Sequence, residues 1–242
     1  MTRTMFVTGA SSGIGRCVAE QAMAAGWRVG LFARTEDALV DVAKSGEALV
    51  LPGDVTDLAS VEGAIATLAK KWGRLDCVFN NAGIFTPQGL IDEIDYDDWT
   101  RSVAVNLTGM FHTARAGFAQ MRAQDPQGGR IINNGSISAH SPREGSVCYT
   151  TTKHAITGLT KTLSLDGRPF DIACGQIDIG NARTPMIDTL AKKAIAGGQT
   201  PPETMNVSDA ARSVLHMANL PAEANVQFMT VMATKMPYVG RG

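Results

Sequence analysis

The chain has 242 residues, of which 44% are hydrophobic and 19% are charged, and α/β chains of about 250 residues often fold as one domain with a large buried core. With 22 basic and 23 acidic side chains the formal net charge is −1, so charge gives no reason to expect binding to nucleic acid or to an anionic membrane. No uninterrupted apolar run approaches the roughly 18 residues of a membrane-spanning helix.

The four cysteines are scattered through the chain, with neither a C-x-x-C pair nor the spacing of metal ligands. A strand-like run, Met5-Phe6-Val7, begins almost at once and leaves no room for a secretory leader before it. We therefore expect reduced thiols, no bound metal and a cytoplasmic location.

Short apolar runs alternate with segments of helical periodicity along the whole chain. The predicted strands are Met5–Val7, Arg28–Ala33, Ala48–Leu51, Leu75–Phe79, Arg130–Ile132, Ile172–Ile177 and Phe228–Val231. The predicted helices cover about Gly13–Ala25, Glu36–Ala43, a segment capped by Asp57, Asp95–Met121, Tyr149–Ser164 and Ser208–Ala218. Strands that alternate with helical crossovers form right-handed βαβ units. We predict one Rossmann-like α/β domain over residues 1–242, a doubly wound parallel sheet of about seven strands with helices on both faces.

A glycine-rich segment, Thr8-Gly9-Ala10-Ser11-Ser12-Gly13-Ile14-Gly15, stands between the first predicted strand and the first predicted helix. Glycines there let the backbone approach a pyrophosphate, and the helix start offers unpaired N–H groups and the positive end of its dipole. A glycine triplet alone fits a tight turn without a ligand about equally well. Its position after the first strand of a βαβ fold favours a dinucleotide site.

The end of the second predicted strand indicates which dinucleotide binds. An acid there would bind the ribose 2′-hydroxyl of NAD, but the strand ends in Ala33-Arg34-Thr35. The planar guanidinium of Arg34 suits a 2′-phosphate, so we predict NADP(H) as the preferred cofactor and NAD(H) as the second option. The alternative for Arg34 is an ordinary surface charge. Asp54, after the third strand, is placed either to accept a hydrogen bond from adenine or to cap a turn.

Tyr149 and Lys153 stand four residues apart and therefore share one face of a predicted helix. A cation beside a phenol lowers its pKa from about 10, which allows proton exchange with a carbonyl or alcohol oxygen near neutral pH. Such a pair by itself is more often a solvated helix face. Ser136 supplies a hydroxyl that can hold the same oxygen. Asn106, near Gly109 inside the long predicted helix, indicates a kink or a functional site because both are poor helix formers.

Together these motifs resemble the short-chain dehydrogenase/reductase family over essentially the whole chain. The matching motifs are T-G-A-S-S-G-I-G at 8–15, D-V at 54–55, N-N-A-G at 80–83, Asn106, Ser136, and Y-x-x-x-K at Tyr149 and Lys153. The resemblance implies an oxidoreductase that moves a hydride between nicotinamide and a carbonyl or alcohol carbon.

The resemblance also implies roles for individual residues. Tyr149 would be the general acid and base, and Ser136 would orient the substrate oxygen. Lys153 would bind the nicotinamide ribose and lower the tyrosine pKa, and Asn106 would hold a water in a proton relay. The implied cofactor contacts are Gly9, Ser11, Ser12, Gly13, Ile14, Gly15, Arg34, Asp54, Val55, Asn81, Ala82, Gly83, Tyr149, Lys153, Gly180, Ala182 and Thr184.

The segment after the sixth predicted strand departs from the family pattern. Relatives have N-P-G followed by a hydrophobic residue and threonine, and Gly180 and Thr184 match this pattern. Ile179 replaces the proline, and Ala182 replaces the larger hydrophobic residue. The nicotinamide pocket is therefore where this chain is expected to differ most from its relatives.

The substrate side is predicted from the loops near the tyrosine and from a flap at 183–206, which carries Gly197-Gly198 and Pro201-Pro202 at one end. The predicted substrate contacts are Ile84, Phe85, Ser138, His140 and Met186. They favour a small or medium, partly apolar ketone, 3-oxoacyl compound or alcohol. The resemblance further implies a homodimer or homotetramer that associates through the long helix and the tyrosine-bearing helix.

Two other hypotheses come from different functional classes. The first is a sensor or scaffold that binds the cofactor without turnover. The complete set of Asn106, Ser136, Tyr149 and Lys153 argues against it, and the altered nicotinamide segment with Ile179 and Ala182 argues mildly for it. The second is an isomerase or dehydratase of nucleotide sugars. Those enzymes need a C-terminal substrate domain, for which the roughly 90 residues after Tyr149 leave little room.

Overall fold

The computed structural model describes residues 2–239, and its framework is a single parallel sheet of seven strands. The strands are β1 Thr4–Thr8, β2 Arg28–Ala33, β3 Ala48–Pro52, β4 Cys77–Asn80, β5 Gly129–Asn134, β6 Ile172–Gly180 and β7 Phe228–Met232. Their order in the sheet is β3-β2-β1-β4-β5-β6-β7, and every neighbouring pair is parallel.

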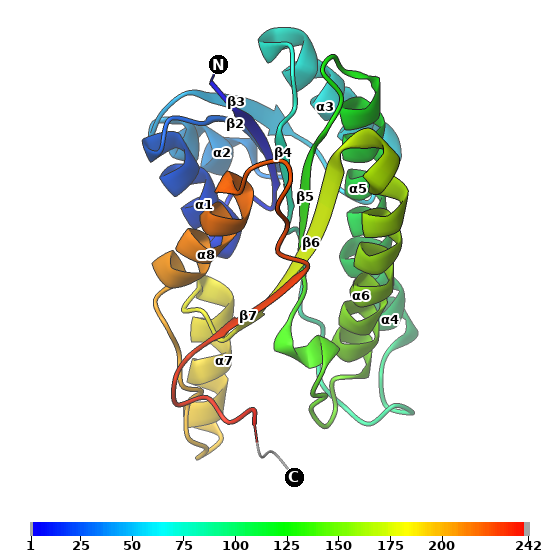
Figure 1. The fold of residues 1–242 in the computed structure, drawn as a ribbon. Coiled ribbons are helices and arrows are strands. Elements are labelled where there is room, and N and C mark those ends of the chain that lie inside the picture. Colours follow the sequence, from blue (N-terminus) through cyan, green and yellow to red (C-terminus); the bar gives the residue numbers. More distant parts are fainter. Residues whose placement is uncertain (1, 240–242) are drawn as a thin grey trace.

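Helices cover both faces of this sheet (Figure 1). The α-helices are α1 Gly13–Ala24, α2 Glu36–Ala43, α3 Leu58–Trp72, α4 Tyr96–Val103, α5 Gly109–Ala123, α6 Val147–Gly167, α7 Pro185–Ala196 and α8 Val207–Asn219. In Figure 1, α1, α2 and α8 lie on one side of the sheet, and α3, α5 and α6 lie on the other. The predicted Rossmann-like, doubly wound α/β fold is confirmed.

Two hydrophobic clusters hold these layers together. Val18, Leu39 and Val214 belong to the cluster under α1, α2 and α8, and Leu68 and Met121 belong to the cluster under α3 and α5. All residues of β1 and β4 are buried, as expected for central strands whose two faces are both covered by helices. Burial of this much apolar surface is the main contribution to the stability of such a sheet.

The long predicted helix over 95–121 is divided in the structure. A π-helical turn, Ala104–Thr108, separates α4 from α5, and Asn106 lies within it. A π-turn widens the backbone by one residue per turn and commonly marks a functional position. The expectation of a kink or site at Asn106 therefore has a structural counterpart.

The predicted flap at 183–206 contains an element that the sequence pattern did not predict. Helix α7 occupies roughly its first half, and Figure 1 shows α7 beside β7, beyond the end of α8. Within residues 2–239, no helix combines the length and the apolar character needed to cross a membrane.

Candidate active site

A cavity of about 320 Å³ opens where β1, β2, β4, β5 and β6 end. This is the edge at which parallel α/β sheets bind ligands, beside the point where the strand order reverses from β1 to β4. The predicted site residues that line it are Gly9, Ser11, Ser12, Gly13, Ile14, Arg34, Asp54, Val55, Asn81, Ala82, Gly83, Ile84, Phe85, Ser136, Tyr149, Lys153, Gly180, Ala182, Thr184 and Met186. Gly15, Asn106, Ser138 and His140 were also predicted as site residues but do not line this cavity.

The glycine turn is shaped by close backbone contacts. Gly9 and Gly13 have φ values of +66° and +56°, a region that residues with a Cβ rarely adopt. A Cβ on Gly15 would lie 2.3 Å from the carbonyl oxygen of Gly9 and 2.6 Å from Nδ2 of Asn81. Gly15 therefore acts behind the cavity wall, by allowing α1 to begin directly against the turn. Ser12, the residue before α1, gives the helix no side-chain cap, which leaves its first N–H groups free for a ligand.

A chain of hydrogen bonds connects the glycine turn to Lys153. The Thr8 hydroxyl accepts from the Asn81 and Ala82 backbone N–H groups at 2.9 and 3.0 Å. Asn134 Nδ2 donates to Asn81 Oδ1 at 2.9 Å, and the Lys153 ammonium donates to the Asn134 carbonyl oxygen at 2.7 Å. This chain crosses β1, β4 and β5 and fixes the floor of the cavity.

Arg34 and Asp54 define the far end of the cavity. Arg34 is exposed directly after β2, and no carboxylate within residues 2–239 pairs with it. Asp54 Oδ1 accepts from both the backbone N–H and the hydroxyl of Thr56, each at 2.9 Å, so this carboxylate also holds its own turn. Both readings of Asp54, a ligand contact and a turn residue, therefore fit its geometry.

Tyr149, Ser136 and Phe85 meet at the opposite end. The Tyr149 and Phe85 rings lie 4.3 Å apart between centroids, and all three residues line the cavity. Ser136 follows β5, and its hydroxyl accepts from the Ser138 backbone N–H at 3.1 Å. The phenol is thus held between an aromatic face and a serine hydroxyl at the mouth of the sheet.

The pKa of Tyr149 corrects one expectation. Burial raises the pKa of Tyr149 above its ordinary value, and interactions with Ser136 and with the positive charge of Arg143 lower it only in part. We expected Lys153 to lower this pKa, but its ammonium is 5.6 Å from the ring centroid and donates to Asn134 instead. The loss of hydration of the phenolate therefore outweighs the nearby positive charges.

Lys153 itself is 3% exposed. Burial lowers the pKa of Lys153 from 10.5 to about 8, and the carboxylate of Asp178 opposes this change. The ammonium therefore loses its proton far more readily than an ordinary lysine.

Asn106 positions a loop in this structure. It is fully buried, its Oδ1 accepts from the Ile84 backbone N–H at 2.8 Å, and its Nδ2 donates to the Ile84 carbonyl at 2.9 Å. These two bonds pair the Asn106 amide with the backbone of Ile84, as two residues pair in a sheet, and they fix the loop that carries Phe85. The π-turn supplies the extra residue that brings this amide to the loop.

Ser138 and His140 were expected to face the substrate, and the structure places them elsewhere. Ser138 is 1% exposed, in the short helical turn Ile137–Ala139 that follows Ser136. His140 Nε2 lies 2.7 Å from Oδ2 of the buried Asp178, and neither Ser138 nor His140 lines the cavity. Ser138 supports the Ser136 turn through its backbone N–H, and His140 supports it through Asp178.

Asp178 and Arg143 are two of the residues of this region that sequence reasoning missed, together with Asn134 and Ile187. Oδ1 of Asp178 accepts from the Ser136 backbone N–H at 2.8 Å. Asp178 lies in β6, 42 residues after Ser136 in the chain, and this bond fixes the position of Ser136. An acid between Ile177 and Ile179, inside an otherwise apolar strand, was the available signal. Arg143 lines the cavity from the loop before α6, and a cation between Ser136 and Tyr149 was the available signal there.

The segment that departs from the family pattern is ordered by the end of the predicted flap. Ala182 forms a parallel bridge with Met205, and the Arg183 N–H donates to the Met205 carbonyl at 2.9 Å. Ala182 is 3% exposed and Ile179 is 9% exposed. Both replacements therefore pack into the protein, and the main chain at Ala182 stays on the cavity wall.

Comparison with known proteins agrees with this geometry. The family model described as short chain dehydrogenase matches residues 3–194. The chain belongs to the short-chain dehydrogenase/reductase family. A 3β-hydroxysteroid dehydrogenase of Mediterraneibacter gnavus is 31% identical to this member over 220 residues, which cover 85% of this chain and 78% of that protein.

Two solved structures show the same fold with a nicotinamide cofactor named in each. A 3-ketoacyl-(acyl-carrier-protein) reductase from Brucella melitensis, complexed with NADH, is 25% identical with a TM-score of 0.85, over 95% of this chain and 96% of its own. ElxO with NADP bound is 25% identical with a TM-score of 0.85, over 96% and 98%. This short-chain dehydrogenase/reductase is therefore an NAD(P)-dependent oxidoreductase that acts on hydroxyl or carbonyl groups.

The residues present fit such a cofactor. The uncapped start of α1 faces the glycine turn, as a pyrophosphate requires. Oδ1 of Asn134 is buried without a hydrogen-bond partner within the described residues, and Asn134 lines the cavity between that turn and Lys153. An unpartnered acceptor at this point is suited to a donor from a bound ligand.

Proposed function

We propose that this protein is an NADP-dependent reductase that converts the carbonyl group of a small or medium, partly apolar compound to an alcohol. The observation that carries the proposal is one cavity with an unpaired guanidinium, Arg34, at one end and Tyr149 with Ser136 at the other. The glycine turn lies between these two ends. When bound, the nicotinamide supplies the hydride.

The protein's own residues would supply the proton and hold the substrate oxygen. A phenol is protonated at neutral pH even at its ordinary pKa of about 10, and burial raises the pKa of Tyr149 further, so its hydroxyl holds a proton that it can donate to a developing alkoxide. The Ser136 hydroxyl would donate a hydrogen bond to the same oxygen. Reduction starts from a protonated phenol, so the resting state of Tyr149 matches the reaction that we propose.

The preference for NADP rests on Arg34. Its guanidinium is exposed at the end of β2, and Glu36 and Asp37 lie one step further, in the first turn of α2. There the two acids interact favourably with the positive end of the helix dipole. This gives them a structural role in α2 rather than a role in binding a ribose hydroxyl. Arg34 is left to pair with a 2′-phosphate.

The substrate class rests on the apolar walls near the tyrosine. Phe85 lies against the Tyr149 ring, and Met186 and Ile187, at the start of α7, line the cavity. Apolar walls around one polar centre are typical of pockets for compact, partly apolar compounds. Three further points stay predictions: closure of the flap at 183–206, a cytoplasmic location, and self-association through α5 and α6. The last is consistent with Phe111 on α5, an apolar side chain that is 48% exposed.

The test is the consumption of NADPH, and separately of NADH, with a panel of ketones, aldehydes, 3-oxoacyl thioesters and quinones. Tyr149→Phe removes only the phenolic hydroxyl, so we expect turnover to fall by about 100- to 10,000-fold while the Kd for NADPH rises by no more than about tenfold, the loss of one hydrogen bond. We expect NADPH to be preferred over NADH.

Two outcomes would contradict the proposal. Equal turnover in Tyr149→Phe would remove this tyrosine as the proton donor. Tight NADPH binding by both proteins with no turnover of any substrate would favour the cofactor-binding sensor, and a substrate changed without net oxidation or reduction would favour the isomerase.

A further inference from the structure

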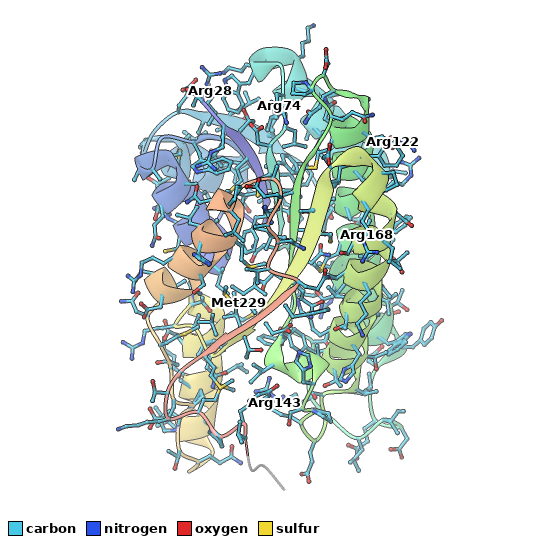
Figure 2. The ribbon with its side chains drawn as sticks, viewed as in Figure 1. Arg28, Arg74, Arg122, Arg143, Arg168 and Met229 are labelled. Atoms are coloured by element: carbon cyan, nitrogen blue, oxygen red, sulfur yellow. The ribbon has the colours of Figure 1, made fainter. Side chains whose placement is uncertain are left out.

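Arg143 is a cationic residue of the cavity that the proposed reaction does not use. It lies in the loop between the helical turn Ile137–Ala139 and α6, six residues before Tyr149. It lines the same cavity as Ser136 and Tyr149, and Figure 2 places it at the end of the molecule where the sheet strands end. Its positive charge makes a small contribution that lowers the pKa of Tyr149, against the larger effect of burial, which raises it.

The guanidinium of Arg143 has no counterpart within residues 2–239. Its Nε is buried without a hydrogen-bond partner, and none of the ion pairs among the described residues includes it. By contrast, Arg16 pairs with Glu20 and Asp41, and Arg101 pairs with Asp98. A buried N–H of a charged group that lacks an acceptor costs free energy, so its retention in a cavity wall indicates a ligand that supplies the acceptor.

The charges along the cavity point to the kind of ligand. Its charged lining residues are Arg34, Asp54, Arg143 and Lys153. Arg34 and Asp54 lie after β2 and β3, at the end assigned to the adenosine, so the tyrosine end has two cations and no lining carboxylate. The Lys153 ammonium gives one of its three N–H donors to the Asn134 carbonyl oxygen, and the resemblance assigns the ammonium to the nicotinamide ribose. Arg143 is therefore the cation at this end that has neither a partner among the described residues nor an assigned role toward the cofactor.

We propose that Arg143 binds a carboxylate carried by the substrate, and that the natural substrate is therefore an oxo acid. This inference rests on the proposed function and names the substrate class of the same site. A guanidinium presents two parallel N–H donors that match the two oxygens of a carboxylate. With the carboxylate on Arg143 and the carbonyl oxygen at Ser136 and Tyr149, two points of the substrate are fixed. The apolar wall formed by Phe85, Met186 and Ile187 would receive the carbon chain between or beside them.

The cofactor phosphates are a less suitable partner for Arg143. The pyrophosphate belongs at the glycine turn and the start of α1, and a 2′-phosphate belongs at Arg34, after β2. Arg143 lies on the segment that leads into the tyrosine-bearing helix. Measurement of the Kd for NADPH in the variants below separates the two partners directly.

The first experiment compares pyruvate, acetoacetate and levulinate with their methyl esters, in the wild type, Arg143→Met and Arg143→Lys. Arg168→Met is the matched control, because Arg168 is exposed, lies outside the cavity and is well separated from Arg143 in Figure 2. We expect Arg143→Met to lower kcat/KM for the best oxo acid by about 10- to 100-fold and to leave its ester within about twofold. Arg143→Lys should recover part of the loss, and Arg168→Met should leave acid and ester unchanged.

Equal losses for acid and ester in Arg143→Met, or a weaker Kd for NADPH in that variant, would overturn the proposal. The second experiment does not depend on turnover. Calorimetric titration of the NADP⁺-saturated proteins with butanoate, butanesulfonate and butanamide should give heat with butanoate in the wild type and Arg168→Met, and none in Arg143→Met. Binding of butanamide as tight as that of butanoate would overturn the carboxylate site. Binding of butanesulfonate without binding of butanoate would overturn the assignment to an oxo acid and indicate a sulfonate substrate instead.

The two experiments also distinguish this proposal from the proposed function. Butanoate binding that depends on Arg143, in a protein that reduces no carbonyl compound, would support the anion site and reject the reductase. Reduction of the esters and uncharged ketones alone, with no heat from butanoate, would support the reductase and reject the anion site.

Discussion

The two ends of the cavity are built in different ways. At the cofactor end, the shape comes from main chain that passes close to main chain, as at Gly9 and Gly15. At the tyrosine end, the shape comes from side chains that reach across the sheet, such as Asp178 in β6 to the Ser136 N–H after β5. The first arrangement depends on eight consecutive residues and on the Asn81–Ala82 segment packed against them, and the second depends on side chains of residues that are 42 positions apart.

This difference explains how one fold serves many reactions. Backbone N–H groups and the dipole at a helix start recognise phosphates regardless of the side chains nearby, so the pyrophosphate site needs glycines at fixed positions rather than particular side chains. Side-chain networks can be changed one residue at a time, which allows the tyrosine end to fit a particular substrate. Substitutions at the cofactor end should therefore lower stability and binding through steric overlap. Substitutions at the tyrosine end should act through the loss of hydrogen bonds and charge.

The largest effect is expected from Gly15→Ala. The added Cβ would overlap the Gly9 carbonyl and Asn81 Nδ2, so the turn must open; we expect a loss of unfolding free energy of about 1–3 kcal/mol and weaker NADPH binding. Denaturant unfolding and fluorescence titration measure the two effects. Gly63→Ala is the control, because its Cβ would meet nothing within 4 Å in the exposed middle of α3, and it should stabilise the protein by about 0.5–1 kcal/mol.

Unchanged NADPH affinity in Gly15→Ala would mean that the cofactor end tolerates a displaced turn. A loss of stability in Gly63→Ala similar to that in Gly15→Ala would attribute both losses to helix geometry rather than to overlap at the turn.

A smaller effect is expected from Asp178→Asn, which removes the charge from the support of Ser136. The carboxylate accepts from Ser136, from Gln176 and from His140, and an amide cannot accept from all three. We expect a loss of about 1–2 kcal/mol in unfolding free energy and a lower kcat, with the Kd for NADPH within about twofold. This result would show that the two ends of the cavity can be perturbed separately.

Asp209→Asn is the matched control for Asp178→Asn. Asp209 pairs with Arg212 on α8 with its side chain 41% exposed, and an exposed pair contributes little, so a change below about 1 kcal/mol is expected. A loss of NADPH affinity in Asp178→Asn would contradict the separation of the two ends.

The smallest effect is expected from pH in the unmodified protein. Because burial lowers the pKa of Lys153 to about 8, the ammonium is present below that pH and is lost above it. Tyr149 stays protonated in this range because its pKa is raised, so a loss of activity would come from Lys153. If reduction requires the ammonium, kcat/KM should fall about tenfold between about pH 7 and about pH 9. A flat profile over this range would mean that Lys153 acts without its charge or that its pKa rises in the complex.

The alternation of strands and helices predicted the seven-stranded parallel sheet because this pattern is local and repeats along the chain. The glycine turn and the spacing of Tyr149 and Lys153 indicated the family in the same way, and the comparisons confirm it. The long helix was predicted over nearly its observed range, with a kink or a site at Asn106, but its division by a π-turn at Ala104–Thr108 was not, since that turn depends on the loop that Asn106 binds. Helix α7 was missed because the glycine and proline pairs that follow it dominated the local pattern.

The sequence by itself determined the fold, the position of the cofactor turn and the pairing of Tyr149 with Lys153, because each depends on residues that are neighbours along the chain. Only the tertiary structure decided the direction of the tyrosine pKa, since burial depends on Phe85 and the surrounding elements packing against the ring. It also decided that His140 turns to Asp178 and that Arg143 faces the cavity without a partner among the described residues. Charge and burial at a site are set by residues far apart in the chain, and those distances exist only after folding.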